Sequence, residues 1–182
     1  MKYLGCIAGV FAASMAAAET PELVVYTYDS FVSDWGPGPA VEKAFEAECA
    51  CDLKFVGAGD GAALLARIKL EGARTVADVI LGLDTNLTAA ATGTELFAAH
   101  SVSAEYSLPI AWDDANFVPY DWGYFAFVHR TGVEAPTSLK ALGESDLKIV
   151  IQDPRSSTPG LGLLMWVKAA YGDEAPLIWE SL

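Results

Sequence analysis

The first half of the chain alternates between short apolar runs and segments in which apolar residues recur at helical spacing. Runs of four to eight residues rich in Val, Ile and Leu are typical of buried strands, and the intervening segments predict amphipathic helices. This order predicts a β-α-β-α-β unit with a parallel sheet and right-handed crossovers. The segments are, in chain order, strand 23–28, helix 39–48, strand 53–56, helix 61–71 and strand 77–83.

The pattern is less regular after this unit. A short helix is expected at 86–91, and the mixed polar and aromatic stretch 93–117 predicts no element. A second α/β unit follows, with strand 123–129, helix 137–142, strand 147–152 and helix 159–171. Two strands and two helices are too few to cover both faces of a parallel sheet, so we expect this second unit to be incomplete.

The first 18 residues have the pattern of a secretory signal peptide. Lys2 precedes an apolar stretch, 3–15, and three alanines at 16–18 provide a cleavage site. The stretch is too short to span a bilayer. We expect cleavage after Ala18 and a soluble product in the periplasm.

Charge and motifs exclude several function classes. The formal charge is −13, with 24 acidic against 11 basic residues, and nucleic acid is not an expected partner because its phosphates need basic surfaces. His100 and His129 lie beside no nucleophile motif, and no G-x-S-x-G, H-E-x-x-H or P-loop is present. We therefore expect no catalytic residue and no cofactor. We also expect the chain to be a monomer.

Beyond the signal peptide the cysteines are Cys49 and Cys51, separated by one residue. Close thiols can pair in an oxidising compartment. No further His or Cys stands at metal-ligand spacing, so no metal site is expected. The pattern is compatible with a local disulfide or with two buried thiols.

Candidate binding residues stand where strands end, because ligands on open α/β sheets bind beyond the carboxyl ends of the strands. Tyr28 and Trp35 follow the first strand. Asp60 and Gly61 follow the second, where Asp60 is expected to cap the next helix and neighbouring glycines let a ligand approach the backbone. Asp84 follows the third strand in a similar way, but no other candidate residue is expected beside it.

The most specific candidate is the sequence Ser156-Ser157-Thr158-Pro159 between a strand and a helix. Thr158 is expected to be the N-cap and Pro159 the first helical residue. Hydroxyls and free N–H groups at a helix N-terminus can hold a phosphate or another polar group. Ordinary helix capping explains the same residues, and chemistry alone leaves both interpretations open.

Four stretches carry a family resemblance: VVYTYDSFVSDWGPGPAVEKAFEAEC, ADVILGLDTNL, FVPYDWGYFAFV and QDPRSSTPGLGLLMW. In them the chain resembles the periplasmic thiamine-binding proteins of ABC importers, over nearly its whole length after the signal. The resemblance implies a type II periplasmic-binding-protein fold of two lobes. The first lobe is expected at 19–120 and the start of the second, truncated here, at 121–182.

The resemblance also implies a ligand and partners. The ligand is thiamine, thiamine monophosphate or thiamine diphosphate, and the partners are a membrane permease and its ATPase. The family's ligand contacts fall on Asp60 and Gly61 from the first lobe and on Ser157 and Thr158 from the second. Tyr28 and Trp35 are expected to form part of the aromatic wall of the ligand site.

Two other functions remain open. Related importers with this architecture carry ferric ion, polyamines or oxyanions, although Tyr, His and carboxylate ligands for iron do not cluster here. A thiaminase-like enzyme would need a cysteine nucleophile. Cys49 and Cys51 are expected at a helix-to-strand connection, at the sheet edge opposite the predicted cleft, which disfavours that enzyme.

Overall fold

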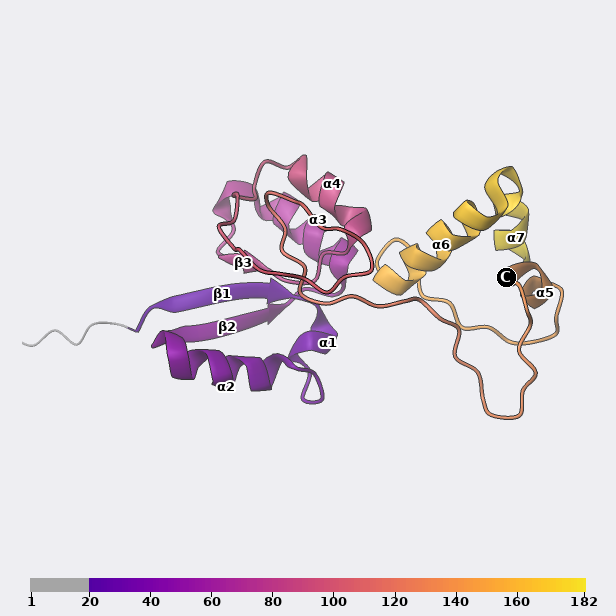
Figure 1. Cartoon of the computed structure of the whole chain (residues 1–182), viewed down its shortest axis with the longest axis horizontal. Helices are drawn as coiled ribbons and strands as arrows, with labels where there is room; N and C mark the ends of the chain where they lie inside the picture. Colours follow the sequence, from indigo (N-terminus) through magenta and orange to yellow (C-terminus); the bar gives the residue numbers. More distant parts are fainter. Residues whose placement is uncertain (1–19) are drawn as a thin grey trace, which may run out of the picture.

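The computed structural model describes residues 20–182, so the predicted signal peptide lies outside the described residues. Figure 1 shows two parts joined by a long connection. We call the first the sheet part, which contains every strand and the helices up to residue 92. We call the second the helical part, which contains the helices from residue 139 onward.

The sheet part is built on three parallel strands in the order β2-β1-β3. They are β1 (Glu22–Thr27), β2 (Asp52–Gly57) and β3 (Val79–Ile80). The predicted parallel arrangement is confirmed, but β3 is shorter than the predicted 77–83. The chain leaves the strand near Gly82, whose φ of 107° is a conformation that favours glycine.

Helices cover both faces of this sheet, with α2 on one side and α3 on the other (Figure 1). The predicted helices are confirmed to within one residue at each end, while α1 was not predicted. Val24 and Tyr26, which alternate along β1, are buried together with Leu64 and Ile68 of α3. The helices are α1 (Asp29–Val32), α2 (Gly38–Cys49), α3 (Gly61–Glu71), the 3-10 turn η1 (Gly72–Arg74) and α4 (Thr85–Thr92).

The helical part has its own hydrophobic core, which shares no residue with the first. Its elements are α5 (Leu139–Gly143), α6 (Thr158–Tyr171), the 3-10 turn η2 (Gly172–Glu174) and α7 (Ala175–Ser181). The core is formed by Leu139, Leu163, Val167, Ala175 and Ile178. The helices α5 and α6 agree with the sequence pattern, whereas α7 was not predicted.

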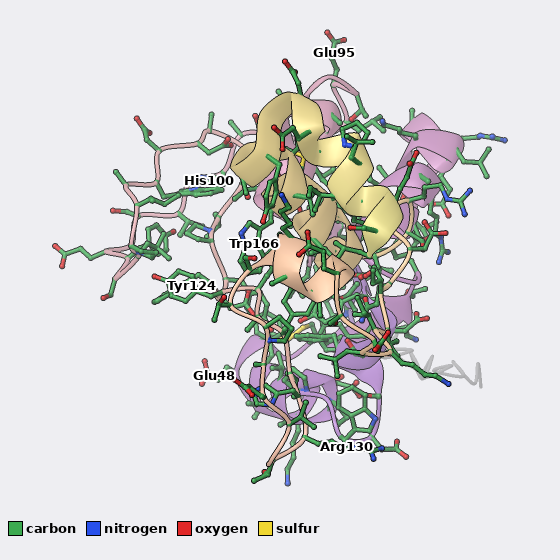
Figure 2. The ribbon with its side chains drawn as sticks, turned by 90° about the vertical axis from the view of Figure 1, so that its right-hand side faces the viewer. Glu48, Glu95, His100, Tyr124, Arg130 and Trp166 are labelled. Atoms are coloured by element: carbon green, nitrogen blue, oxygen red, sulfur yellow. A yellow bond between two sulfur atoms is a disulfide. The ribbon has the colours of Figure 1, made fainter. Side chains whose placement is uncertain are left out.

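The predicted strands 123–129 and 147–152 are wrong for this structure, because within residues 20–182 no strand follows β3. A strand is stabilised by backbone hydrogen bonds to a neighbour, and neither segment has such a neighbour among the described residues. Tyr124, labelled in Figure 2, belongs to the first segment and is 81% exposed. The alternating apolar pattern therefore exists without the pairing that would make it a strand.

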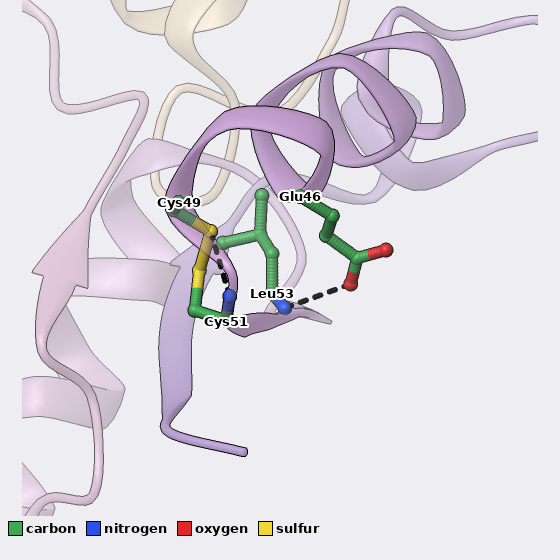
Figure 3. The surroundings of a disulfide bond; sticks show 4 residues. All are labelled: Glu46, Cys49, Cys51 and Leu53. Atoms are coloured by element: carbon green, nitrogen blue, oxygen red, sulfur yellow. Dashed lines mark hydrogen bonds between the residues drawn. A yellow bond between two sulfur atoms is a disulfide. The ribbon is translucent and has the colours of Figure 1, made fainter.

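Cys49 and Cys51 form a disulfide at the junction of α2 and β2 (Figure 3). The intervening Ala50 has a left-handed backbone, φ 52°, which ends the helix. Just beyond, the Leu53 N–H donates to Glu46 Oε1 at 2.9 Å. Of the two states that the sequence left open, the structure contains the disulfide.

Across residues 20–182 no helix combines the length and the apolar character that crossing a membrane requires.

Candidate ligand-binding site

The carboxyl ends of the three parallel strands lie at one edge of the sheet, where the turns that follow them are tied together. The Asp29 N–H donates to the Gly59 carbonyl at 2.8 Å, and the Gly59 N–H donates to Asp29 Oδ1 at 3.0 Å. These two bonds hold the turn after β2 against the start of α1. The turn that carries Asp60 and Gly61 is therefore fixed in position.

Asp60 is the N-cap of α3, as the sequence predicted. Its backbone is extended, and its Oδ1 accepts the Gly61 N–H at 2.8 Å. Its other oxygen, Oδ2, accepts the Thr158 N–H at 2.9 Å from the start of α6. One carboxylate thus contacts the N-termini of two helices that are 98 residues apart in sequence.

The N-terminus of α6 differs by one residue from the prediction. Ser157, not Thr158, is the N-cap: its backbone is extended and its Oγ accepts the Gly160 N–H at 3.3 Å. Ser157 Oγ also donates to Gln152 Oε1. Thr158 therefore begins the helix, and its N–H is free to reach Asp60 because the N–H groups of the first helical turn have no partner within the helix.

Gly61 lies where three segments meet. A Cβ at this position would stand 3.0 Å from Thr158 Oγ1 and 3.1 Å from the Gly82 carbonyl oxygen. Such distances are tighter than ordinary van der Waals contact. Glycine is therefore the residue that lets the start of α6 approach the strand ends this closely.

Tyr28 lies at the end of β1 against the backbone of Gly82, where a Cβ would overlap the tyrosine ring. Its Oη is 3.3 Å from the Oη of Tyr120. Burial, more than any other cause, raises the pKa of the Tyr28 phenol. The hydrogen bond with Tyr120 and the negative charges of Asp121 and Asp60 add to this effect. The phenol thus keeps its proton and can take part in hydrogen bonds.

Tyr120 extends this site beyond the predicted residues. It is one wall of an open pocket of about 210 Å³ whose lining combines aromatic and acidic side chains: Glu105, Tyr106, Ser107, Leu108, Pro119, Tyr120, Asp121 and Trp122. Reasoning from strand ends did not find Tyr120, because residues 119–122 belong to no element. The signal was the Pro-Tyr-Asp-Trp sequence itself, which places aromatic and acidic residues side by side.

Trp35 lies in the turn between α1 and α2 and is 80% exposed. Within the described part of the chain, no aromatic or hydrogen-bond contact joins it to the other five predicted residues. Asp84 caps α4 by accepting the Asn86 N–H at 2.8 Å, and makes no hydrogen bond to α6. The structure thus brings Asp60, Gly61 and Thr158 into contact, with Ser157 beside Thr158 and with Asp60 contributing to the electrostatic field at Tyr28.

The arrangement suits a ligand with two chemically different ends. Two carboxylates, Asp60 and Asp121, and a neutral phenol favour a cationic or hydrogen-bonding group. The start of α6, with the Ser157 and Thr158 hydroxyls, suits a hydroxyl or an anionic group. Among residues 20–182 no group of three or more His, Cys, Asp or Glu is placed to hold a metal ion.

The chain was compared with family models, with known proteins and with solved structures. No family model matches the chain. The chain is 56% identical over 167 residues to a thiamine-binding periplasmic protein of Salmonella typhimurium, covering 89% of this chain and 51% of that protein. It is 52% identical over 182 residues to the protein of the same name from Escherichia coli, covering 97% of this chain and 54% of that protein.

A solved structure of a periplasmic thiamin binding protein superposes with a TM-score of 0.87 at 52% identity, covering 92% of this chain and 54% of the other. The chain therefore spans about half the length of the relatives it matches. The mixed α/β architecture with a small parallel sheet agrees with that structure. The resemblance to the periplasmic thiamine-binding proteins, predicted from the sequence, is confirmed over this half of their length.

Proposed function

We propose that this chain is part of a periplasmic solute-binding protein that captures thiamine, or its monophosphate or diphosphate, for an ABC importer. The observation that carries the proposal is the contact of Asp60 and Gly61 with Thr158. Two separate regions of the sequence supplied these candidates, and they meet at one point. The names of relatives at 40 to 56% identity support thiamine as the ligand.

In this proposal the protein has a two-lobed type II fold with the ligand between the lobes. Residues 19–120 form the first lobe and residues 121–182 begin the second. The two hydrophobic cores that share no residue support this division, since each lobe needs a core of its own. The contact between Asp60 and Thr158 then lies at the cleft.

The ligand fits the site by charge. The thiazolium ring of thiamine is a cation, and Tyr28 with the carboxylates of Asp60 and Asp121 offers a favourable environment for it. A cation over an aromatic ring gains roughly 0.5 to 2 kcal/mol, and Trp35 is a second candidate for such a contact. The hydroxyethyl or phosphate end would then point toward Ser157 and Thr158.

The remaining parts of the proposal follow from a transport role. The chain would be exported through residues 1–18, act in the periplasm as a monomer without a cofactor, and deliver its ligand to a permease and ATPase. The relatives are named as periplasmic proteins, which supports the compartment. Nothing in the acidic composition favours nucleic acid.

The alternatives receive less support. A thiaminase-like enzyme needs a free thiolate, and Cys49 and Cys51 are joined in a disulfide. The relatives are named as binding proteins and not as enzymes. For ferric ion, residues 20–182 contain no group of three or more His, Cys, Asp or Glu placed to hold a metal ion.

A calorimetric titration tests the proposal. A chimera in which residues 20–182 replace the matching region of the Escherichia coli relative would be titrated with thiamine and its two phosphates, beside the unmodified relative. We expect saturable binding of at least one of the three ligands. Loss of all binding in a folded chimera would contradict the proposal and lead to titrations with ferric ion and polyamines.

A further inference from the structure

The disulfide between Cys49 and Cys51 lies outside both hydrophobic cores. Both cysteines are half-buried, at the junction of α2 and β2 (Figure 3). A disulfide exchanges when a thiolate reaches one of its sulfurs, so access decides whether it can react. The position at the surface makes this disulfide accessible in the folded chain.

The disulfide closes a very short loop. Its cysteines are two positions apart in the sequence. In the chain-entropy model, a disulfide stabilises a protein by constraining the unfolded chain, and this effect grows with the number of residues in the closed loop. A loop of this size constrains the unfolded chain far less than a bridge between distant elements. The disulfide is therefore expected to add little to the stability of the fold.

The start of β2 is held by bonds that do not involve the disulfide. The Leu53 N–H donates to Glu46 Oε1 at 2.9 Å (Figure 3), and the Asp52 N–H donates to the Pro21 carbonyl at 2.8 Å. β2 also pairs with β1 along its whole length. Reduction of the disulfide leaves these bonds in place, so we expect the strand to stay paired.

A hydrogen bond distinguishes the two sulfurs. The Cys51 N–H donates to Cys49 Sγ at 3.2 Å (Figure 3), and among residues 20–182 no hydrogen bond reaches Cys51 Sγ. A donor of this kind stabilises a charged sulfur more than a neutral one. Cys49 is therefore the better leaving group, and attack is expected at Cys51.

We propose that Cys49 and Cys51 form a thiol–disulfide exchange site, which dithiols reduce and reoxidise in the folded chain. A thiolate of the dithiol attacks Cys51 Sγ, the bond between the two cysteines breaks, and Cys49 leaves as a thiolate that takes up a proton. The second thiol of the dithiol then attacks the sulfur bound to Cys51 and releases Cys51 as a thiol. Two electrons pass to the pair, and the dithiol becomes a disulfide.

The spacing of the cysteines favours a dithiol over a monothiol. After the first step, the Cys49 thiolate lies two residues from the mixed disulfide and can expel a monothiol by attacking Cys51 again. A dithiol completes the reduction because its second thiol is also held nearby. The pair stands at the start of β2, about 20 Å from the strand end that leads to Asp60, so the proposal does not depend on the identity of the ligand.

A redox equilibrium tests the proposal. The purified chain would be equilibrated with mixtures of reduced and oxidised dithiothreitol, in native buffer and in concentrated urea, and its thiols counted by maleimide labelling and mass spectrometry. We expect the equilibrium constants for reduction in the two conditions to agree within about tenfold, because the disulfide adds little to the fold. Structural disulfides favour the oxidised form in the folded chain by roughly thirtyfold or more, and a ratio of that size would overturn the proposal.

Urea unfolding followed by circular dichroism tests whether the fold persists after reduction. The Cys49→Ser/Cys51→Ser variant should keep a cooperative transition, and the unmodified chain held in reduced dithiothreitol gives the same measurement without a substitution. Loss of the transition in the reduced chain would overturn the proposal.

The direction of attack is tested with a monothiol. After brief treatment with 2-mercaptoethanol and rapid alkylation, peptide mass spectrometry should find the mixed disulfide mainly on Cys51 and the alkyl group mainly on Cys49. The reverse distribution would overturn the assignment of Cys49 as the leaving group.

Discussion

At the scale of single residues, the site depends on which side-chain oxygen accepts each backbone N–H at the helix N-termini. Asp60 uses both oxygens, one for each of two helices, whereas Asp84 caps one helix with one oxygen. Ser157 takes the cap of α6 and leaves the Thr158 N–H available. A cap is worth about 1 kcal/mol and needs no function to explain it. The second bond of Asp60 is what capping does not explain.

Combined Ser157→Ala and Thr158→Ala substitutions in the chimera should weaken thiamine monophosphate and diphosphate by roughly tenfold more than thiamine. The reason is that hydroxyl bonds to a charged phosphate are worth about 1.5 to 3 kcal/mol. Calorimetric titration of the three ligands measures the difference. Ser138→Ala, which removes the cap of α5, controls for loss of a helix cap, and equal weakening of all three ligands would count against a phosphate contact.

Asp153 precedes α6 and has a pKa held at about 2 by its hydrogen bonds with the Arg155 side chain and backbone. Because this pKa is depressed, the ionised form is favoured by the fold. Any stability it provides is present above the ordinary value of 3.8 and is lost as pH falls through about 2. A carbon-13 titration of the Asp153 carboxyl should show this low midpoint, and Arg155→Ala should raise it. A midpoint near 3.8 in the unmodified chain would contradict the bond.

At the scale of helices and strands, the stability of the sheet part depends on one face of α3. Leu64 has 0% of its surface exposed and packs with Val24 and Tyr26 of β1. Leu70, on the same helix, is 81% exposed. Two leucines of identical propensity therefore have different energetic roles, which are set by burial.

Leu64→Ala should lower the free energy of unfolding by about 2 to 5 kcal/mol, since it removes buried methyl groups and leaves a cavity. Leu70→Ala should change it by less than about 0.5 kcal/mol. Urea denaturation of the two variants measures both values. A similar loss for both leucines would show that α3 does not pack on the sheet as described.

The elements that the sequence predicted well are those marked by local signals. The pattern placed β1, β2, α2, α3 and α6 to within one or two residues, because apolar periodicity and caps are local signals. It failed for 123–129 and 147–152, since a strand also needs a neighbour that periodicity does not reveal. It placed the α6 cap one residue late because Ser157 and Thr158 are both good caps, and only the backbone decides between them.

The candidate site was predictable in part. Asp60 and Gly61 were found because they follow the end of β2, and Ser157 and Thr158 because they precede a helix, although the strand predicted before them does not form. The contact across 98 residues is a property of the fold. Tyr120 was missed because it lies in no regular element, and its partner Tyr28 is 92 residues away. Long-range pairing of this kind leaves no periodic trace in the sequence.

At the scale of the whole molecule, the chain has two parts, each with its own hydrophobic core, joined by a long connection (Figure 1). The hydrogen bond between Asp60 and Thr158, at the candidate site, runs between these parts. A ligand held there contacts both parts, so its binding would also order them relative to each other. The account is therefore tested by where the ligand binds as well as by how strongly it binds.

Hydrogen exchange measured by mass spectrometry on the chimera, with and without saturating thiamine, tests that place most directly. We expect protection to increase in peptides that contain Gly61 and Thr158, with little change in peptides from α2 or α5. Thiamine binding that leaves both of these peptides unprotected would contradict a site at the meeting point of the two parts.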